Sequence, residues 1–217
     1  MIRAIVFDFD GVIADSEPLH LRALQDVIAP LALEISRTEY YDRYLGYDDV
    51  GTFRAIGEQK GVEFTDEDIA SLIAAKSVVY QSLVAAGGVL FAGASACIER
   101  LAPHYPLGIA SGALRHEIEA ILRAGALDGR FRFIVASGET LTGKPAPDPY
   151  LRAAALHGIP AGSCVAIEDS RWGIESAAAA GMRSIGITHT YPAHELSSAD
   201  VIVESLEQLT PELIRTL

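Results

Sequence analysis

Two carboxylates follow the first apolar segment of the chain. Segment 2–7 is rich in Ile, Val and Phe, and Asp8 and Asp10 come directly after it, with Gly11 next. A strand buried on both faces of a sheet carries a charged side chain only where it leaves the sheet. We therefore expect Asp8 at the carboxyl edge, where open α/β sheets bind their ligands. Two acids at that edge need a cation to offset their charge.

A hydroxyl and a glycine follow a second apolar run. Ser111 and Gly112 come after segment 107–110, and a helical pattern begins near Leu114. A helix N-terminus offers free backbone N–H groups and a positive dipole end, which together bind phosphate. The alternative is an ordinary N-cap, because serine and glycine are both common there.

A lysine stands among prolines further along the chain. Segment 142–150 reads TGKPAPDPY, and its three prolines restrict the loop and precede a helix, so Lys144 is held on a rigid stem. A carboxylate can approach a phosphate only beside such a fixed cation, since two like unit charges about 4 Å apart repel by roughly 4 kcal/mol at an effective dielectric constant near 20. The alternative is a solvated surface lysine.

Two further acids follow a buried strand pattern. Segment 164–167 is followed by Glu168, Asp169 and Ser170. An aspartate that N-caps the next helix explains one acid but not both. Together with Asp8 and Asp10, these residues provide hard oxygen ligands with room for water and phosphate, a set that favours Mg²⁺.

The apolar runs predict a parallel sheet. They are short and continuous rather than alternating, which is typical of strands buried on both faces. Helical patterns separate them, among them 114–124 and the alanine-rich segment 171–180. Repeated strand and helix units predict an α/β fold with a doubly wound, Rossmann-like parallel sheet. The six expected strands are 2–7, 107–110, 133–136, 164–167, 184–187 and 201–203.

One interval lacks strand patterns. Residues 16–86 show helical spacing at 19–28, 48–59 and 66–84, and Thr65 and Asp68 have the spacing of a capping box before the last of these helices. We therefore predict an all-helical cap domain at 16–86, inserted into an α/β core domain of residues 1–15 and 87–217. Gly87 and Gly88 suit a hinge.

Composition and charge limit the partners. Half of the 217 residues are hydrophobic, which is enough for a sizeable core, and the net charge of -12 argues against nucleic acid or an anionic membrane as a partner. Without a signal-peptide pattern or an apolar run of about 18 residues, we expect a cytoplasmic protein with no membrane partner. Cys97 and Cys164 are expected to be buried free thiols. The sequence does not specify the oligomeric state, and we expect a monomer or a weak homo-oligomer.

The four motifs, in this order, resemble those of the haloacid dehalogenase superfamily, over essentially the whole chain. The resemblance implies a magnesium-dependent phosphohydrolase in which Asp8 attacks phosphorus and forms an aspartyl phosphate. Asp10 would protonate the leaving oxygen and then deprotonate water, a role that dehalogenases do not need because a halide leaves without a proton. Ser111 and Lys144 are the other catalytic residues that the resemblance implies.

The resemblance also implies ligand contacts. A metal ion would be held by the carboxylates of Asp8 and Asp169, by the backbone carbonyl of Asp10 and, through water, by Glu168. Substrate contacts in the core are implied for Gly11, Gly112 and Ala113.

The helical insert resembles the cap of β-phosphoglucomutase and of related sugar-phosphate phosphatases. Segment 15–20, DSEPLH, resembles the entry to this cap and implies that His20 contacts substrate near the general acid/base. Lys76 falls where the mutases place a phosphate-contacting lysine. Asp49, however, stands where the mutases carry an arginine that binds a second phosphate. We therefore expect hydrolysis of a small phosphomonoester, such as a sugar phosphate or a similar metabolite.

Several alternatives stay open. A β-phosphoglucomutase-type mutase is the nearest, whereas a non-catalytic binding protein is disfavoured because no motif aspartate or lysine is missing. Phosphonate hydrolysis through a Schiff base would need a cap lysine with a lowered pKa, and neither Lys60 nor Lys76 has a sequence pattern that indicates one. Asp48, Asp49 and Arg54 could contact substrate hydroxyls or simply form a solvated helix start.

Overall fold

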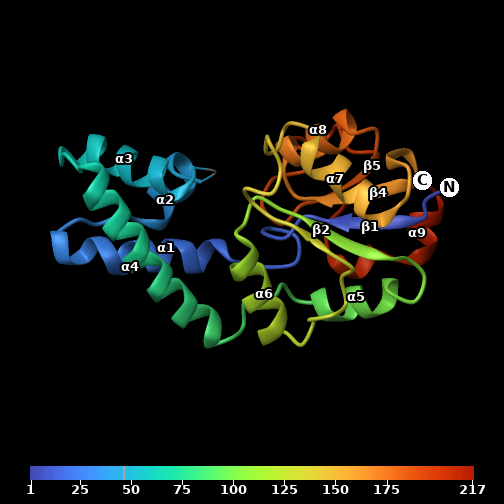
Figure 1. The fold of residues 1–217 in the computed structure, drawn as a ribbon, viewed down its shortest axis with the longest axis horizontal. Coiled ribbons are helices and arrows are strands. Elements are labelled where there is room, and N and C mark those ends of the chain that lie inside the picture. Colours follow the sequence, from blue (N-terminus) through green and yellow to red (C-terminus); the bar gives the residue numbers. More distant parts are fainter. Residues whose placement is uncertain (46) are drawn as a thin grey trace. The chain divides into compact units, whose positions relative to one another are not determined.

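The structure is a computed structural model of the 217-residue chain and describes residues 1–45 and 47–217. The chain forms two compact units, one of Met1–Ser16 with Gly88–Leu217 and one of Glu17–Gly87. The larger unit contains the sheet with its covering helices, and the smaller unit is helical (Figure 1). That these units act as a catalytic core and a cap stays a prediction.

The larger unit contains a six-stranded parallel sheet, which confirms the predicted fold class. The strand order is β3-β2-β1-β4-β5-β6. The chain builds outward from β1 to β3 and then returns to place β4 on the other side of β1, so the order reverses between β1 and β4. Ligands of open α/β sheets bind at the carboxyl ends of the strands at such a reversal. The strands are β1 Ala4–Phe7, β2 Leu107–Ala110, β3 Ile134–Val135, β4 Cys164–Glu168, β5 Arg183–Ile187 and β6 Val201–Val203.

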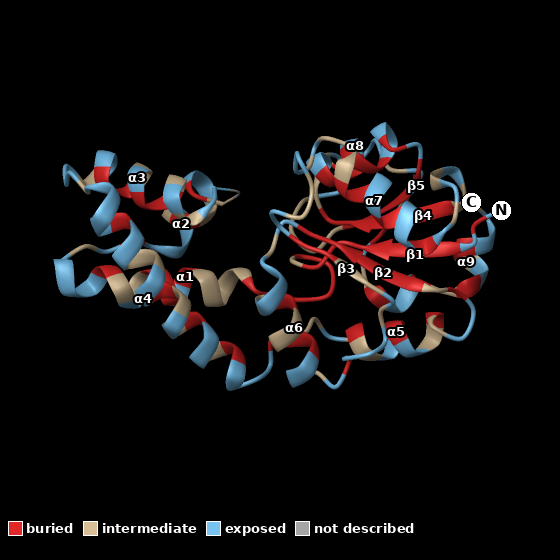
Figure 2. Cartoon of the chain, viewed as in Figure 1, coloured by how far each residue is buried: buried red, intermediate tan, exposed pale blue. Residues whose placement is uncertain are grey.

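Helices cover both faces of the sheet, and strands β1, β2 and β4 are buried along their whole length (Figure 2). Helices α7 and α8 lie on one face and α5 and α6 on the other (Figure 1). Small side chains such as Ala4, Ala110 and Ala166 face α7 and α8, so the alanine-rich α8 packs closely on the sheet. The helices are α5 Ala94–Leu101, α6 Arg115–Ala124, α7 Asp148–His157, α8 Arg171–Ala179 and α9 Pro211–Arg215, with short 3-10 turns at Ala161–Ser163 and Leu206–Gln208.

Both cysteines are buried and free, as predicted. Cys97 lies in α5 and Cys164 begins β4. Burial raises the pKa of each thiol to about 11, so neither is a reactive thiolate near neutral pH.

The smaller unit is held together by an apolar cluster that includes Leu24, Phe53 and Ile69. The predicted capping box is present, because the side chains and backbone of Thr65 and Asp68 bond reciprocally. Helix α2 was not predicted; it has seven residues and buries only Tyr40. The helices are α1 Glu17–Ile28, α2 Arg37–Arg43, α3 Asp49–Lys60 and α4 Asp66–Ala85, with a 3-10 turn at Ala29–Leu31.

Helix α4 is the one helix in the described ranges that is long and apolar enough to cross a membrane, judged by length and composition alone. Its first turn holds three acids, and Lys76 in its middle is buried beside Asp49. Charged groups at membrane depth are costly, so these residues favour a helix of a globular unit. The absence of a membrane partner stays a prediction.

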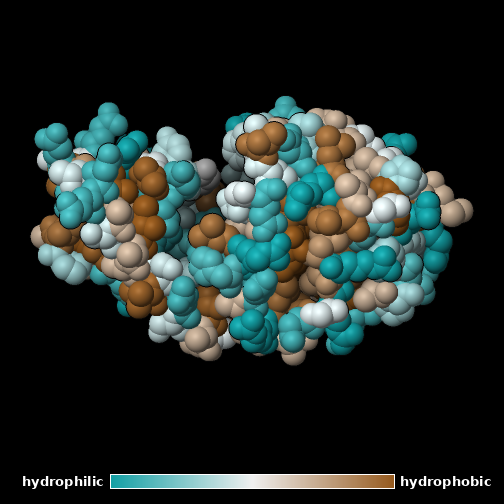
Figure 3. Space-filling model, in the orientation of Figure 1, coloured by the Kyte–Doolittle hydropathy of each residue, from teal (hydrophilic) through white to brown (hydrophobic). Residues whose placement is uncertain are grey.

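Hydrophilic and hydrophobic side chains are mixed over the visible face of the larger unit (Figure 3). Its exposed large apolar residues include Leu114, Leu141 and Trp172. Exposed apolar side chains of this kind are normal on soluble folds.

Candidate active site

The loop after β1 is a tight turn that carries the first two acids. The Asp8 N–H donates to the Ile167 carbonyl at 2.9 Å, which continues the pairing of β1 with β4. The Phe9 carbonyl then accepts N–H bonds from all three residues 12–14, so the loop folds back at once. Gly11 has a φ of +77°, and a Cβ built there would lie 1.9 Å from Asp169 Oδ2. The turn therefore passes directly over the carboxylate of the fourth motif.

Asp10 points to a different partner from Asp8. The Ser16 hydroxyl donates a short hydrogen bond to Asp10 Oδ1. This hydrogen bond orients the Asp10 carboxylate in the loop that begins at Asp8. Asp10 was predicted as a site residue, whereas no role was predicted for Ser16, although the two lie only six residues apart.

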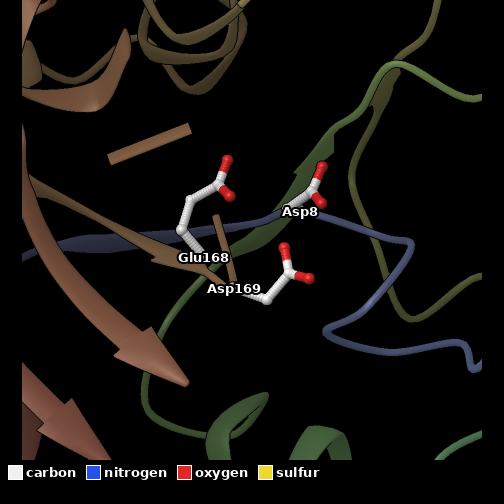
Figure 4. Close-up of side chains that lie close together, drawn as sticks. All are labelled: Asp8, Glu168 and Asp169. Carbon is white, nitrogen blue, oxygen red and sulfur yellow. The ribbon is translucent and has the colours of Figure 1, made fainter. Parts of the chain in front are cut away.

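Three carboxylates converge at the carboxyl edge of β1 and β4. One oxygen each from Asp8, Glu168 and Asp169 lies within 4.8 Å of the others, and Figure 4 shows the groups facing a common space. Burial raises the pKa of Asp8 to about 7 against the effect of Lys144, and Glu168 and Asp10 raise it further. Burial, followed by the charges of Asp8 and Glu168, also raises the pKa of Asp169. This excess of negative charge on hard oxygen donors fits a divalent metal ion, and the three carboxylates could hold one.

Lys144 bridges two of the three acids. Its ammonium lies 2.6 Å from Asp8 Oδ1 and 2.5 Å from Glu168 Oε1. Burial alone would lower the pKa of Lys144, but the two carboxylates outweigh it and raise the pKa above its usual value. The side chain is only 14% exposed, so the surface alternative is wrong. The proline-rich stem leads the ammonium inward, and Ser176 Oγ on α8 donates to the Ala146 carbonyl at 2.5 Å and fixes that stem.

Tyr150 and Gly173 complete the surroundings of Glu168, and neither was found from the sequence. The Tyr150 hydroxyl donates to Glu168 Oε1 at 2.6 Å, and the Lys144 ammonium lies 5.0 Å from the centre of its ring. A Cβ built at Gly173 would lie 1.9 Å from Glu168 Oε1, so the first turn of α8 leaves space for this carboxylate. Both residues lie beside motif residues in the sequence, but the motifs do not indicate that they contact Glu168.

The loop after β2 differs from the expectation in one respect. Ser111 is buried, and its Oγ accepts the Ala113 N–H at 3.1 Å. One N–H that was expected to be free is therefore already bonded. Helix α6 begins at Arg115 with Leu114 as its N-cap, so Ser111 is not the cap of that helix. Gly112 is exposed and lies between the two bonded residues.

An unpredicted arginine fixes the start of α6. Arg115 Nε lies 2.6 Å from Glu139 Oε1, and its Nη2 donates to the Ile134 carbonyl at 2.7 Å. Glu139 Oε2 also accepts the Ala136 N–H at 3.3 Å. This bridge ties the loop that carries Ser111 to the end of β3.

Ser170, the serine of the fourth motif, caps the helix that follows it. Ser170 Oγ accepts the Gly173 N–H at 3.1 Å and is the N-cap of α8. The alternative that Asp169 caps this helix is therefore wrong. Asp169 is left with its carboxylate in the acidic cluster (Figure 4).

Within the smaller unit, the structure brings His20, Lys76 and Asp49 together. The Lys76 ammonium forms a short ion pair with Asp49 and lies 3.3 Å from His20 Nδ1. Burial and then Lys76 lower the pKa of His20 to about 3, so the ring is neutral and accepts from the ammonium. The imidazole stacks on Tyr80 with the ring centres 4.2 Å apart.

The other charged residues noted in this unit have structural partners. Asp48 is the N-cap of α3 and accepts the Gly51 N–H at 2.7 Å. Arg54 pairs with Asp66 at 3.0 Å, and Lys60 pairs with Glu39 at 2.8 Å. Gly46, the glycine before the segment that departs from the mutase pattern, lies outside the described residues.

Comparison with known proteins identifies the class. The model of the haloacid dehalogenase-like hydrolases matches residues 5–187, so the chain belongs to this family and is a hydrolase of the phosphatase type. It is 33% identical to the protein CbbY of Rhodobacter capsulatus, over 98% of this chain and 99% of that one. It is 32% identical to hexitol phosphatase B of Escherichia coli K12, over 96% and 95%.

The chain is also similar to a β-phosphoglucomutase and to solved structures of CbbY. It is 29% identical to the β-phosphoglucomutase of Bacillus subtilis, over 98% of this chain and 94% of that one. A crystal structure of CbbY from Rhodobacter sphaeroides with phosphate superposes with a TM-score of 0.87 at 28% identity, over the whole of both chains. A variant of that CbbY was crystallised with xylulose 1,5-bisphosphate.

Proposed function

We propose that this protein is a magnesium-dependent phosphatase that hydrolyses a small phosphomonoester, a sugar phosphate or a similar metabolite. The observation that carries the proposal is the bridging of Asp8 and Glu168 by Lys144, 2.6 and 2.5 Å from their oxygens. A buried cation beside one reactive carboxylate suits an anionic substrate, because it offsets the repulsion between the attacking carboxylate and a phosphoryl group.

The chain's own residues divide the chemistry. Asp8 attacks phosphorus in line, so that an oxygen–phosphorus bond forms to its carboxylate as the ester bond breaks. Asp10, oriented by Ser16, gives a proton to the leaving oxygen and later takes one from the water that cleaves the aspartyl phosphate. Ser111, Gly112 and the loop to Ala113 bind the phosphoryl oxygens, while Lys144 stabilises the charge on them.

The acidic cluster is proposed as the magnesium site. The carboxylates of Asp8 and Asp169 and the carbonyl of Asp10 would hold the ion directly, with Glu168 acting through water. Oxygen donors of this kind suit a hard cation, and burial, with the neighbouring carboxylates, raises the pKa of both Asp8 and Asp169, which a bound cation would counteract. When bound, magnesium supplies Lewis-acid stabilisation of the phosphoryl charge.

The substrate is proposed to carry one phosphate group rather than two. Asp49 forms an ion pair with the ammonium of Lys76 in the smaller unit. The pair therefore offers no net positive charge to a second phosphate. A mutase needs such a group to retain its bisphosphate intermediate. The mutase alternative keeps support from the similarity to β-phosphoglucomutase, and the bisphosphate bound by a CbbY variant makes a sugar bisphosphate the necessary comparison.

The smaller unit is proposed to act as a substrate-binding cap through His20 and Lys76. We also propose a cytoplasmic location, a monomer or weak homo-oligomer, and no nucleic-acid or membrane partner. The net charge of -12 supports the absence of polyanionic partners.

The experiment is a screen of phosphorylated metabolites, with inorganic phosphate release as the readout. We expect turnover of hexose or hexitol monophosphates that EDTA removes and added magnesium restores. Calcium should substitute poorly, because its looser coordination misplaces the carboxylates. Full activity after exhaustive chelation would contradict the metal site, and circular dichroism of the chelated protein shows whether any loss comes from unfolding.

A further inference from the structure

The segment after β5 reaches the candidate site, although it contains none of the four motifs. Residues 188–190 follow the end of β5 at Ile187, and the Thr188 N–H donates to the Val203 carbonyl at 3.0 Å. This bond holds the start of the segment against β6. The next two side chains, His189 and Thr190, then face the loop after β1 and the acidic cluster.

His189 is hydrogen-bonded to the loop that carries the first two acids. Its Nδ1 lies 3.0 Å from the Gly11 carbonyl. A carbonyl oxygen can only accept, so the proton of this bond belongs to Nδ1. The bond joins residues 178 positions apart in the chain.

A stacked ring fixes the plane of that imidazole. The ring of Phe91 lies 4.1 Å from the His189 ring between centres, at an angle of 27°. The Phe91 N–H donates to the Ile13 carbonyl at 3.0 Å, so this partner is itself attached to the same loop. His189 is therefore held from two sides in the orientation that bonds Gly11.

Thr190 acts on the other side of the same loop. A side-chain hydrogen bond from Thr190 lowers the pKa of Asp169, against the larger effect of burial. A Cβ at Gly11 would lie 1.9 Å from Asp169 Oδ2 and 2.7 Å from Thr190 Oγ1. The backbone at Gly11 therefore lies close to both the Asp169 carboxylate and the Thr190 hydroxyl, and a side chain there would displace them.

We propose that His189 and Thr190 are positioning residues that fix the spacing between the Asp8–Gly11 loop and Asp169. The geometry that carries this is one short segment that is hydrogen-bonded to the loop of the proposed nucleophile through His189 and that brings the Thr190 hydroxyl, like the Asp169 carboxylate, against Gly11. The consequence for magnesium affinity rests only on the metal site of the proposed function, whereas the consequence for catalysis rests on the phosphatase activity as well. Residues that orient metal ligands typically change metal affinity or activity by about 10- to 100-fold when they are removed.

The test compares His189→Leu, which removes the donor, with His189→Asn, which restores a donor nitrogen near the position of Nδ1. His194→Leu is the matched control, since His194 is an exposed histidine in the same connection. The readouts are magnesium affinity by calorimetry, and kcat and KM for p-nitrophenyl phosphate. We expect His189→Leu to weaken magnesium binding and to lower kcat by about 10-fold or more, with little change in KM. His189→Asn should recover most of the magnesium affinity and of kcat. The control, His194→Leu, should match wild type.

The second pair of variants is Thr190→Val, which removes the hydroxyl, and Thr190→Ser, which keeps it. Valine is close to threonine in shape, so this pair carries the test if His189→Leu does not fold. Wild-type magnesium affinity and kcat in a folded His189→Leu or, failing that, in Thr190→Val would overturn the proposal. If the wild-type protein hydrolyses no phosphomonoester, the proposed function fails, and the magnesium affinities still decide this inference.

Discussion

The Lys144 ammonium lies 2.6 Å from the Asp8 carboxylate, although 136 residues separate the two in the chain. The same nitrogen lies 2.5 Å from Glu168, so one cation serves two acids. The proposed nucleophile is consequently neither free nor fully neutralised. Its reactivity depends on a lysine that a different part of the sequence supplies.

Replacing Lys144 by methionine should lower kcat by about 100- to 1000-fold, because a neutral side chain cannot stabilise the phosphoryl charge. Inorganic phosphate release under saturating substrate measures the change. Lys60→Met is the control, since Lys60 forms one partly exposed ion pair with Glu39 and such pairs contribute little. Equal losses in the two variants would show that Lys144 has no special role.

Asp8→Asn should abolish turnover while the protein stays folded. The amide is nearly isosteric but not nucleophilic, and it removes one charge from a cluster whose members repel one another. Phosphate release and circular dichroism measure the two effects. Hydrolysis at a substantial fraction of the wild-type rate by the purified variant would rule out covalent catalysis at Asp8.

Tyr150→Phe should lower the free energy of unfolding by roughly 1.5–3 kcal/mol, the usual worth of a buried hydrogen bond to a charged group. The variant keeps the ring near Lys144 and removes only the 2.6 Å bond to Glu168. Urea unfolding near neutral pH provides the measurement. Tyr47→Phe, at a residue that is 59% exposed, should change stability by less than about 0.5 kcal/mol. A Tyr150 variant as stable as this control would show that Glu168 does not depend on the hydroxyl.

The smaller unit should lose stability in acid because His20 is neutral when folded. The pKa of His20 falls from 6.5 to about 3 through burial and Lys76, so the unfolded chain binds more protons in that interval. Stability therefore falls as the pH drops below 6.5 toward 3. Wild type should lose roughly 1–3 kcal/mol more than His20→Gln between about pH 7 and about pH 4.5, as measured by urea unfolding. Parallel pH profiles for the two proteins would contradict a buried neutral His20.

A product analysis separates the phosphatase from the mutase. With β-glucose 1-phosphate and a trace of glucose 1,6-bisphosphate, inorganic phosphate should be the main product, because Asp49 pairs with Lys76 and this pair offers no net positive charge to a second phosphate. Asp49→Asn should raise the kcat/KM of the bisphosphate relative to the monophosphate. Asp48→Asn removes the same charge one residue away and keeps an N-capping side chain, so it should leave the ratio unchanged. Faster formation of glucose 6-phosphate than of free phosphate by wild type would favour the mutase.

The sheet and the order of the motifs were predictable because their signals are local. A continuous apolar run ending in acids identifies both a buried strand and its carboxyl end, as at Asp8 and at Glu168. The short helices α2 and α9, of seven and five residues, were not found. Each buries too few residues to impose a helical period on the sequence.

The contacts that tune the site could not be predicted, because they join distant segments. His189 reaches Gly11, Tyr150 reaches Glu168 and Arg115 reaches Glu139 through tertiary packing, and nothing in the letters near each residue names its partner. The Lys76 and Asp49 pair shows the same limit. Each residue could be singled out by position, but their mutual neutralisation depends on how α3 and α4 approach one another.

The lack of a side chain at Gly173 limits which substitutions this position can tolerate. A methyl group there would have to displace the Glu168 carboxylate, whose oxygens would lie 1.9 and 2.0 Å from it. Glu168 cannot retreat without leaving Lys144 and Tyr150, so even the smallest substitution would affect Asp8, which is two contacts away from Glu168. In a library of random variants, position 173 should therefore be depleted of every residue but glycine under selection for the proposed phosphatase activity, although it carries no functional group of its own.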